Sequence, residues 1–229
     1  LGSGWLELGR FADAHRQYTE AGALFEELGL RHLGYTVLLA LTSFTSAHAG
    51  AYEQALEEGK RAVALSRELG HKRSEGLALI ALGMAAVAMG NDAAADSYLA
   101  VGTDYLREIN QLDELAQGIG VQALVSYRQG ELDKAKESVL SALAIVSELR
   151  GLLATPDYPL AVWALMLADR GEHEQASAVY QLLLGEPFGA ASRWFEDLFG
   201  RFIPHTPPAG FMPPEERWTA ITQLYQTLS

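Results

Sequence analysis

The chain has 229 residues, of which 49% are hydrophobic, so it can bury a sizeable core. Its formal charge of −12, from 29 acidic and 17 basic residues, argues against a nucleic-acid-binding surface, which needs clustered Lys and Arg. The absence of cysteine excludes disulfides, thiolate metal sites and a cysteine nucleophile, and no apolar run reaches the roughly 18 residues of a membrane helix.

A short motif recurs along the chain: Gly, any residue, usually a bulky residue, two further residues, then Ala. The five copies are GRFADA at 9–14, GAYEQA at 50–55, GNDAAA at 90–95, GELDKA at 130–135 and GEHEQA at 171–176. Successive glycines are 41, 40, 40 and 41 residues apart. A constant period of this size indicates a repeat architecture.

Each copy of the motif lies between two segments with helical spacing of apolar residues. The segments before four of the glycines are predicted to be helices over 34–48, 74–88, 114–128 and 158–169. After each glycine, small or apolar residues recur at i, i+4 and i+7, first as Ala14, Tyr18 and Ala21. The glycine suits the end of a helix, where the backbone needs a positive φ. With no proline before residue 156 and no alternating segment, we predict helix pairs and almost no strand.

Few motifs in the chain carry chemistry. GIGVQA at 118–123 satisfies a dinucleotide-binding fingerprint, but it lies inside a predicted helix rather than after a strand, so close helix packing is the favoured interpretation. No histidine pair has a metal-binding spacing, and no nucleophile elbow or phosphate-binding loop occurs. Acidic pairs such as Glu57-Glu58 are interpreted as solvated helix faces. We therefore predict no catalytic, cofactor-binding or metal-binding residue, and a protein that is not an enzyme.

After residue 185 the period stops. An aromatic helix is predicted over 191–203, a proline-rich linker over 204–214, and a last helix over 214–228. One side of the last helix carries the apolar residues Trp218, Ile221, Leu224, Tyr225 and Leu228. Two interpretations of the aromatic residues remain open: they cover the end of the last repeat, or they form an exposed patch for a partner.

The repeated pattern resembles the tetratricopeptide repeat, whose signature is Leu-Gly on the first helix, an aromatic three residues after that Gly, then Gly-x-aromatic-x-x-Ala. Leu82-Gly83 with Gly90 and Ala95 matches it well. Other copies keep the small residue but lose the leucine, at Thr42-Ser43, Gln122-Ala123 and Trp163-Ala164. The period of about 40 residues exceeds the usual 34 and resembles the sensor arrays of bacterial signal-transduction (STAND) ATPases and maltose-regulator-type transcription activators.

The resemblance implies an all-α helix-turn-helix solenoid, a right-handed superhelix, with a C-terminal helical cap. The expected units are a half repeat at 1–29, repeats at about 30–70, 71–110, 111–151 and 152–188, and a cap at 189–229. The opening residues Leu1-Gly2, Trp5 and Gly9 match the family signature. We therefore expect residues 1–8 to be helical and to stack on a helix at 12–28, and the chain to be a fragment of a longer array.

In this family the first helices line a concave groove. Positions carried over from the family pattern predict an apolar groove with a few polar groups. The groove or ligand candidates are Phe44, His48, Met84, Gln117, Leu124, Tyr127, Arg128, Tyr158 and Asp169. The groove either binds an apolar helix or peptide, or packs on itself. Arg128 and Asp169 are expected to pair across a repeat boundary, and the carboxylate-clamp pattern that recruits chaperone tails is absent.

The resulting functional hypothesis is a non-enzymatic interaction or sensor module in a larger bacterial signalling or transcription regulator. Its partner would be a protein, a peptide or a small-molecule inducer, with no nucleic acid, membrane or cofactor. The alternative is an architectural scaffold that has no groove ligand and self-associates through its aromatic C-terminal end. No signal peptide is visible, so a cytoplasmic location is expected.

Overall fold

The computed structural model describes residues 2–30, 32–149, 157–206 and 210–228, and within these ranges the chain is helical with no strand. The all-α prediction is confirmed. The first ten helices are α1 Gly2–Glu7, α2 Phe11–Glu27, α3 Leu33–His48, α4 Tyr52–Leu69, α5 Lys72–Ala88, α6 Asp92–Glu108, α7 Leu112–Arg128, α8 Leu132–Leu149, α9 Asp157–Asp169 and α10 His173–Leu184.

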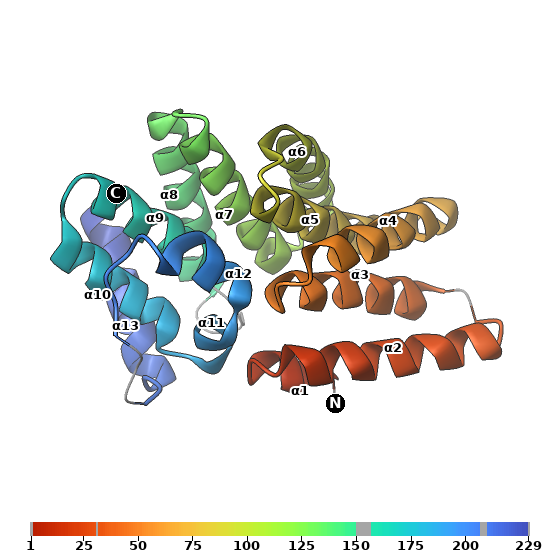
Figure 1. The fold of residues 1–229 in the computed structure, drawn as a ribbon. Coiled ribbons are helices and arrows are strands. Elements are labelled where there is room, and N and C mark those ends of the chain that lie inside the picture. Colours follow the sequence, from red (N-terminus) through yellow and green to blue (C-terminus); the bar gives the residue numbers. More distant parts are fainter. Residues whose placement is uncertain (1, 31, 150–156, 207–209, 229) are drawn as a thin grey trace.

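Consecutive helices pack as pairs, α3 with α4, α5 with α6, α7 with α8 and α9 with α10, and each pair contacts the next. Figure 1 shows the pairs side by side in chain order. The four helices predicted before the motif glycines begin one or two residues earlier than expected and end where expected. The predicted boundary between repeats at 151 and 152 lies outside the described residues.

The five motif glycines occupy the turns between the helices of each pair. Their φ angles lie between 67° and 81°, in the left-handed region that favours glycine. Gly29, Gly70 and Asn110 adopt positive φ at turns between pairs. The sequence period of about 40 residues therefore corresponds to a recurring turn geometry.

The opening helix α1 packs on α2, as predicted for residues 1–8, although Leu1 lies outside the described residues. A Cβ atom added to Gly2 would lie 2.4 Å from Cε1 of Tyr18, so only glycine allows this approach. The guanidinium of Arg10 sits over the Trp5 ring, 4.0 Å from its centroid. The first residues are thus an integral part of the helical packing.

The glycines of GIGVQA lie inside α7 and serve close packing. A Cβ at Gly118 would be 2.7 Å from Cγ2 of Thr103, and one at Gly120 would be 2.5 Å from Cβ of Tyr158. Both approaches come from neighbouring helices, α6 and α9. The close-packing interpretation therefore agrees with the structure.

The C-terminal part forms α11 Pro187–Ala191, α12 Arg193–Phe195, the π-helix η1 Glu196–Gly200 and α13 Pro214–Leu228. Helix α13 packs on α8 and α10 and buries Ile221. Arg217 of α13 donates to the Leu182 carbonyl at 2.6 Å, pairs with the buried Asp157, and lies 3.1 Å from Glu186. Burial and the Asp157 charge raise the pKa of Glu186, which reduces the repulsion between the two carboxylates that share Arg217.

Candidate functional site

The segment 187–203 lies across α3, α5 and α9 instead of only covering the last helix pair. Figure 1 shows α11 and α12 in the middle of the molecule, between the α9–α10 pair and the ends of α1 and α3. The rings of Trp194, Phe195 and Phe199 are at most 1% exposed. The Trp194 indole N–H donates to the Met84 carbonyl of α5 at 3.0 Å. We call the surfaces of α3, α5 and α9 beneath this segment the inner face.

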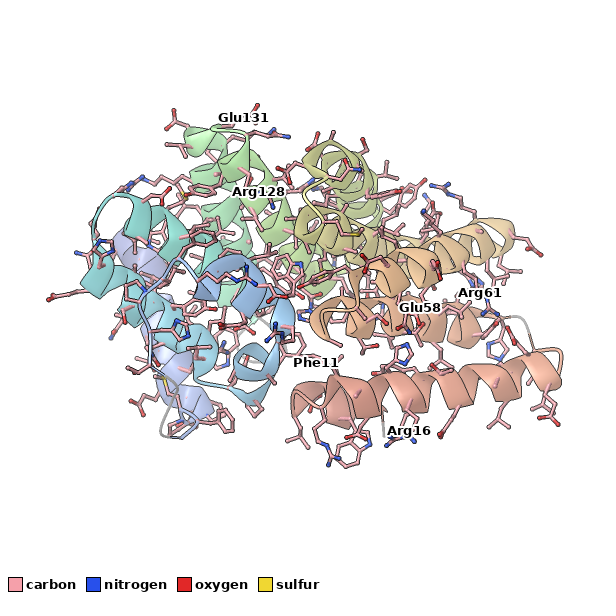
Figure 2. The ribbon with its side chains drawn as sticks, viewed as in Figure 1. Phe11, Arg16, Glu58, Arg61, Arg128 and Glu131 are labelled. Carbon is pink, nitrogen blue, oxygen red and sulfur yellow. The ribbon has the colours of Figure 1, made fainter. Side chains whose placement is uncertain are left out.

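The same segment reaches the first two motif turns. A Cβ at Gly9 would lie 2.4 Å from the Pro187 carbonyl oxygen, and one at Gly50 would lie 3.2 Å from Cβ of Arg193. The Phe11 ring, which points from α2 toward α11 in Figure 2, meets Phe188 edge to face at 5.3 Å. Residues nearly 180 positions apart therefore pack directly on one another.

A buried polar chain fixes the segment to the inner face. The His48 ring lies between two hydroxyls, with Nδ1 2.7 Å from Ser192 Oγ and Nε2 2.7 Å from Tyr158 Oη. The Tyr158 hydroxyl approaches the Met84 sulfur at 3.9 Å, and the Phe195 amide donates to Ser192 Oγ at 3.4 Å. In this chain each hydrogen-bond donor has an acceptor when the Ser192 hydroxyl donates to His48 Nδ1 and His48 Nε2–H donates to the Tyr158 hydroxyl.

Burial alone sets the protonation of His48. The ring is fully buried among aromatic side chains, which lowers its pKa to about 3, so the imidazole is neutral. A serine beside a neutral imidazole is also the arrangement of an activated nucleophile. Ser192 is 2% exposed and His48 is 0% exposed, so a substrate cannot reach the pair in this conformation. The contact is structural: it joins α3, α9 and the C-terminal segment.

At the edge of the inner face a cleft of about 470 Å³ remains open between the ends of α5, α7 and α9 and the helix η1. Its floor is apolar and its rim is aromatic and charged. The lining residues are Ala88, Gly90, Leu124, Tyr127, Arg128, Leu165, Asp169, Asp197, Leu198 and Phe202. A volume of this size is within the range of small-ligand sites.

Arg128 stabilises the turn beside the cleft. Its Nη1 donates to the Val87 carbonyl at 2.9 Å, and its Nε lies 3.1 Å from Asp92 Oδ2. Figure 2 shows Arg128 extending from the end of α7 toward the α5–α6 pair. The pair predicted between Arg128 and Asp169 is not formed, because Arg128 pairs with Asp92 and Asp169 accepts from Tyr127. Arg128 thereby holds the ends of α5 and α6 against α7.

The two acidic residues of the cleft have different partners. Asp197 accepts from the Tyr52 hydroxyl at 2.8 Å and from Arg193 at 3.0 Å. Asp169 is exposed and accepts through Oδ2 from the Tyr127 hydroxyl. Burial and the bond to Asp169 raise the pKa of Tyr127, so its hydroxyl stays protonated as a donor. The charge of Asp197 is balanced by a cation, whereas Asp169 faces a neutral phenol.

The structure separates the predicted groove residues into groups. Phe44, His48, Met84 and Tyr158 are buried beneath the C-terminal segment, at most 4% exposed. Leu124, Tyr127, Arg128 and Asp169 come together in the cleft. Gln117 is half-buried on α7, outside the lining of the cleft.

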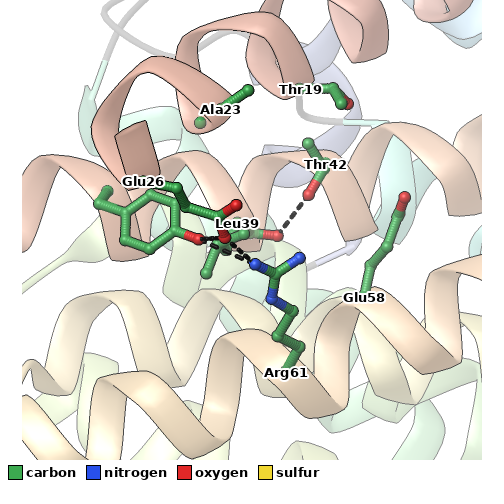
Figure 3. A pocket seen from close by; sticks show the side chains of 9 residues that line it. Thr19, Ala23, Glu26, Leu39, Thr42, Glu58 and Arg61 are labelled. Carbon is green, nitrogen blue, oxygen red and sulfur yellow. Dashed lines mark hydrogen bonds and ion pairs between the residues drawn. The ribbon is translucent and has the colours of Figure 1, made fainter. Parts of the chain in front are cut away.

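A second, smaller pocket of about 160 Å³ lies between α2, α3 and α4 (Figure 3). Its Glu26 accepts from Tyr35 and pairs with Arg61, and both contacts lower the pKa of Glu26. Its other carboxylate, Glu58, accepts from Ser46 at 2.6 Å and also from His15 and Gln54. Both carboxylates in this pocket are therefore matched by donors of the chain itself.

The predicted groove residues do not include Ser192, Asp197 and Phe202, because these three lie beyond the last repeat. A signal was available in the composition. An apolar inner face on several helices needs an apolar cover of similar extent. The cluster of aromatics in 188–202 is the one non-repeating segment rich enough to supply it.

Compared with known proteins, the chain matches no family model and no curated protein sequence. Within the described ranges, no helix is both long and apolar enough to cross a membrane. In those ranges there is also no group of three or more His, Cys, Asp or Glu residues placed to hold a metal ion.

Proposed function

We propose that the chain is a non-enzymatic interaction module, built as a tetratricopeptide-type solenoid, with its ligand site in the cleft lined by α5, α7, α9 and η1. The helix pairs would form a right-handed superhelix in a bacterial signalling or transcription regulator. Helix α13 would cap the last pair, and segment 187–203 would fill most of the concave groove. The ligand would be a protein, a peptide or a small inducer.

One observation carries this proposal. Four residues predicted to face a groove, Leu124, Tyr127, Arg128 and Asp169, line one cleft of about 470 Å³. The polar side chains around His48, and those around Glu58, form hydrogen bonds within their own clusters. An open cleft with an apolar floor and a few polar groups at its rim is the usual form of a ligand site.

A ligand screen by thermal shift tests the proposal. Peptides and small metabolites are screened against the wild-type chain, and the binders are retested by calorimetry on Tyr127→Ala and Leu198→Ser. We expect binders that lose affinity about tenfold in both variants. Lys136→Ala, an exposed change on α8, is the control and keeps full affinity. Binders that are insensitive to both cleft variants would remove the cleft as the site.

A second candidate, a self-associating scaffold, is favoured by another observation. Four leucines at the end of α2 and the start of α3 are 43% to 68% exposed: Leu24, Leu28, Leu30 and Leu33. The aromatic C-terminal end is a weaker candidate interface, because its largest rings are buried. Light scattering distinguishes the two functions. A concentration-dependent dimer that Leu24→Glu with Leu28→Glu returns to monomer would support the scaffold.

A further inference from the structure

We propose that the cleft recognises an organic cation, a positively charged amine on an apolar body, with the charge placed at Asp169 and between the Tyr127 and Phe202 rings. This inference deepens the proposed function, because it rests on the cleft being a ligand site. It assigns a ligand class from three features of the lining: its unbalanced charge, its exposed aromatic ring and its apolar floor.

The charge balance of the cleft favours a cation. Arg128 is matched by Asp92, at 3.1 Å. Asp197 is matched by two arginines, Arg193 at 3.0 Å and Arg201 at 3.6 Å.

Among the charged residues that line the cleft in the described part of the chain, Asp169 alone has a neutral partner, the Tyr127 hydroxyl. An ionised carboxylate offers about four acceptor positions, so Asp169 can accept from a ligand while it keeps the bond from Tyr127. A bound ammonium group would supply the missing positive charge.

The rim carries a large aromatic side chain that the fold does not use. Phe202 is 62% exposed, whereas Phe199, three residues earlier, is fully buried. The faces of aromatic rings attract cations, and sites for alkylated ammonium groups combine such rings. Tyr127 lines the same cleft from α7, whereas Phe202 comes from the segment that follows η1. The two rings and one carboxylate form a suitable set for a cation.

The floor determines the rest of the ligand. Leu124, Leu165 and Leu198 line the cleft below the charged rim, so the body of the ligand is apolar. An anion is disfavoured because it would face Asp169 and Asp197, and the one arginine of the lining is already bound to Asp92 and Val87. The cleft thus selects for an amine with an aliphatic or aromatic body.

Matched probes of one size test the charge preference. Phenethylamine, which is cationic at pH 7, is titrated into the full chain alongside neutral 2-phenylethanol and anionic phenylacetate. Binding is followed by amide NMR shifts of residues lining the cleft. We expect saturable shifts with the amine, and affinity about three- to tenfold weaker with the alcohol. The preference should shrink as salt is added, because the charges are partly exposed.

Two variants locate the preference. Asp169→Asn keeps the shape and the acceptor for Tyr127 but removes the charge, and it should reduce the advantage of the amine over the alcohol to the part that the two rings supply. Phe202→Leu keeps an apolar rim without a ring, and it should weaken the amine more than the alcohol. Glu137→Gln, an exposed residue of α8 outside the lining, changes the net charge equally and should leave the preference intact.

A second pair of probes identifies the source of the cation. Acetyl-Leu-Lys-Leu-amide and acetyl-Leu-Gln-Leu-amide differ only in a basic side chain. Binding of the lysine peptide in preference to both small amine and glutamine peptide identifies a protein segment as the natural ligand. Preference for the free amine identifies a small molecule.

The outcomes separate this inference from the function beneath it. Equal binding of amine and alcohol in the cleft, unchanged by Asp169→Asn, overturns the cation preference and leaves the interaction module standing. The cation preference is also overturned if no cationic probe shifts the amide NMR signals of the residues lining the cleft. The proposed function is then tested by the independent ligand screen with Tyr127→Ala and Leu198→Ser.

Discussion

The residue two positions before a motif glycine is buried in one copy of the motif and exposed in others. In the second copy it is His48, which is fully buried beneath segment 187–203. In the fourth and fifth copies it is Arg128 and Asp169, which are exposed at the cleft. Equivalent positions in a repeat therefore share a surface but not an environment. The environment depends on whether segment 187–203 covers the position.

The largest expected effect comes from removing the main anchor of that segment. Trp194→Ala should lower the free energy of unfolding by about 3 to 5 kcal/mol, because it leaves a large cavity and frees the Met84 carbonyl. Urea unfolding measures this loss. The matched control at the cleft is Phe202→Ala, which should change stability by less than about 1 kcal/mol. Similar losses in the two variants would contradict the distinction between a filled and an open region.

Two tyrosines provide a finer comparison. Tyr158→Phe removes the partner of His48 Nε2 inside the inner face, so we expect a loss of about 1 to 3 kcal/mol in the free energy of unfolding. Tyr127→Phe removes a hydrogen bond to Asp169 at the cleft, where water can replace it, and should cost about 0.5 kcal/mol or less. Denaturant midpoints of the two variants measure the difference, and equal losses would break the comparison.

Acid should weaken the inner face specifically. Because burial lowers the pKa of folded His48 to about 3, the unfolded chain binds a proton below pH 6.5 that the folded chain does not. The stability from the neutral ring is complete above pH 6.5 and is lost as the pH falls toward 3. This contribution should fall by about 2 kcal/mol between pH 7 and pH 5.

His48→Gln should flatten this part of the stability profile, measured by urea unfolding at several pH values. His173→Gln, at the exposed first residue of α10, should keep the wild-type slope. An unchanged slope in His48→Gln would mean that the ring is hydrated or charged in the folded protein.

The smallest expected effect is at the proposed ligand site itself. Asp169→Asn should change the free energy of unfolding by about 0.5 kcal/mol or less, which is typical of exposed sites. The melting temperature should therefore shift only slightly. Calorimetric melting measures this change. A large loss of stability would mean that Asp169 supports the fold. The NMR titration of Asp169→Asn would then report on a destabilised chain.

The helical part of the fold was predictable because it depends on local patterns. The turn glycines, the apolar faces and the absence of early prolines each act within a few residues, and α3, α5, α7 and α9 were located to within two residues. Leu124, Tyr127, Arg128 and Asp169 are among the residues predicted to line a groove, from the positions carried over from the tetratricopeptide pattern. These four residues lie together because the period is preserved in three dimensions.

The remaining features depend on contacts between distant residues. Ser192 and His48 are 144 positions apart, and no local pattern relates them. The pairing of Arg128 with Asp92, rather than Asp169, depends on how closely α7 approaches the α5–α6 turn. The regular helix expected over 191–203 is instead broken into short pieces, among them the π-helix Glu196–Gly200, in a segment whose Trp194, Phe195 and Phe199 rings are all buried.

The contacts of Gly9 and Gly50 with segment 187–203 have a consequence for how the chain folds. In an array whose units touch only their neighbours, the ends unfold first and the middle persists. Here segment 187–203, which follows the last helix pair, contacts the first two motif turns. The beginning and the end of the array are therefore in direct contact. The early and late helices should therefore lose their amide protection together. Folding should also be slow for a helical protein, because the contacts that complete it span most of the chain.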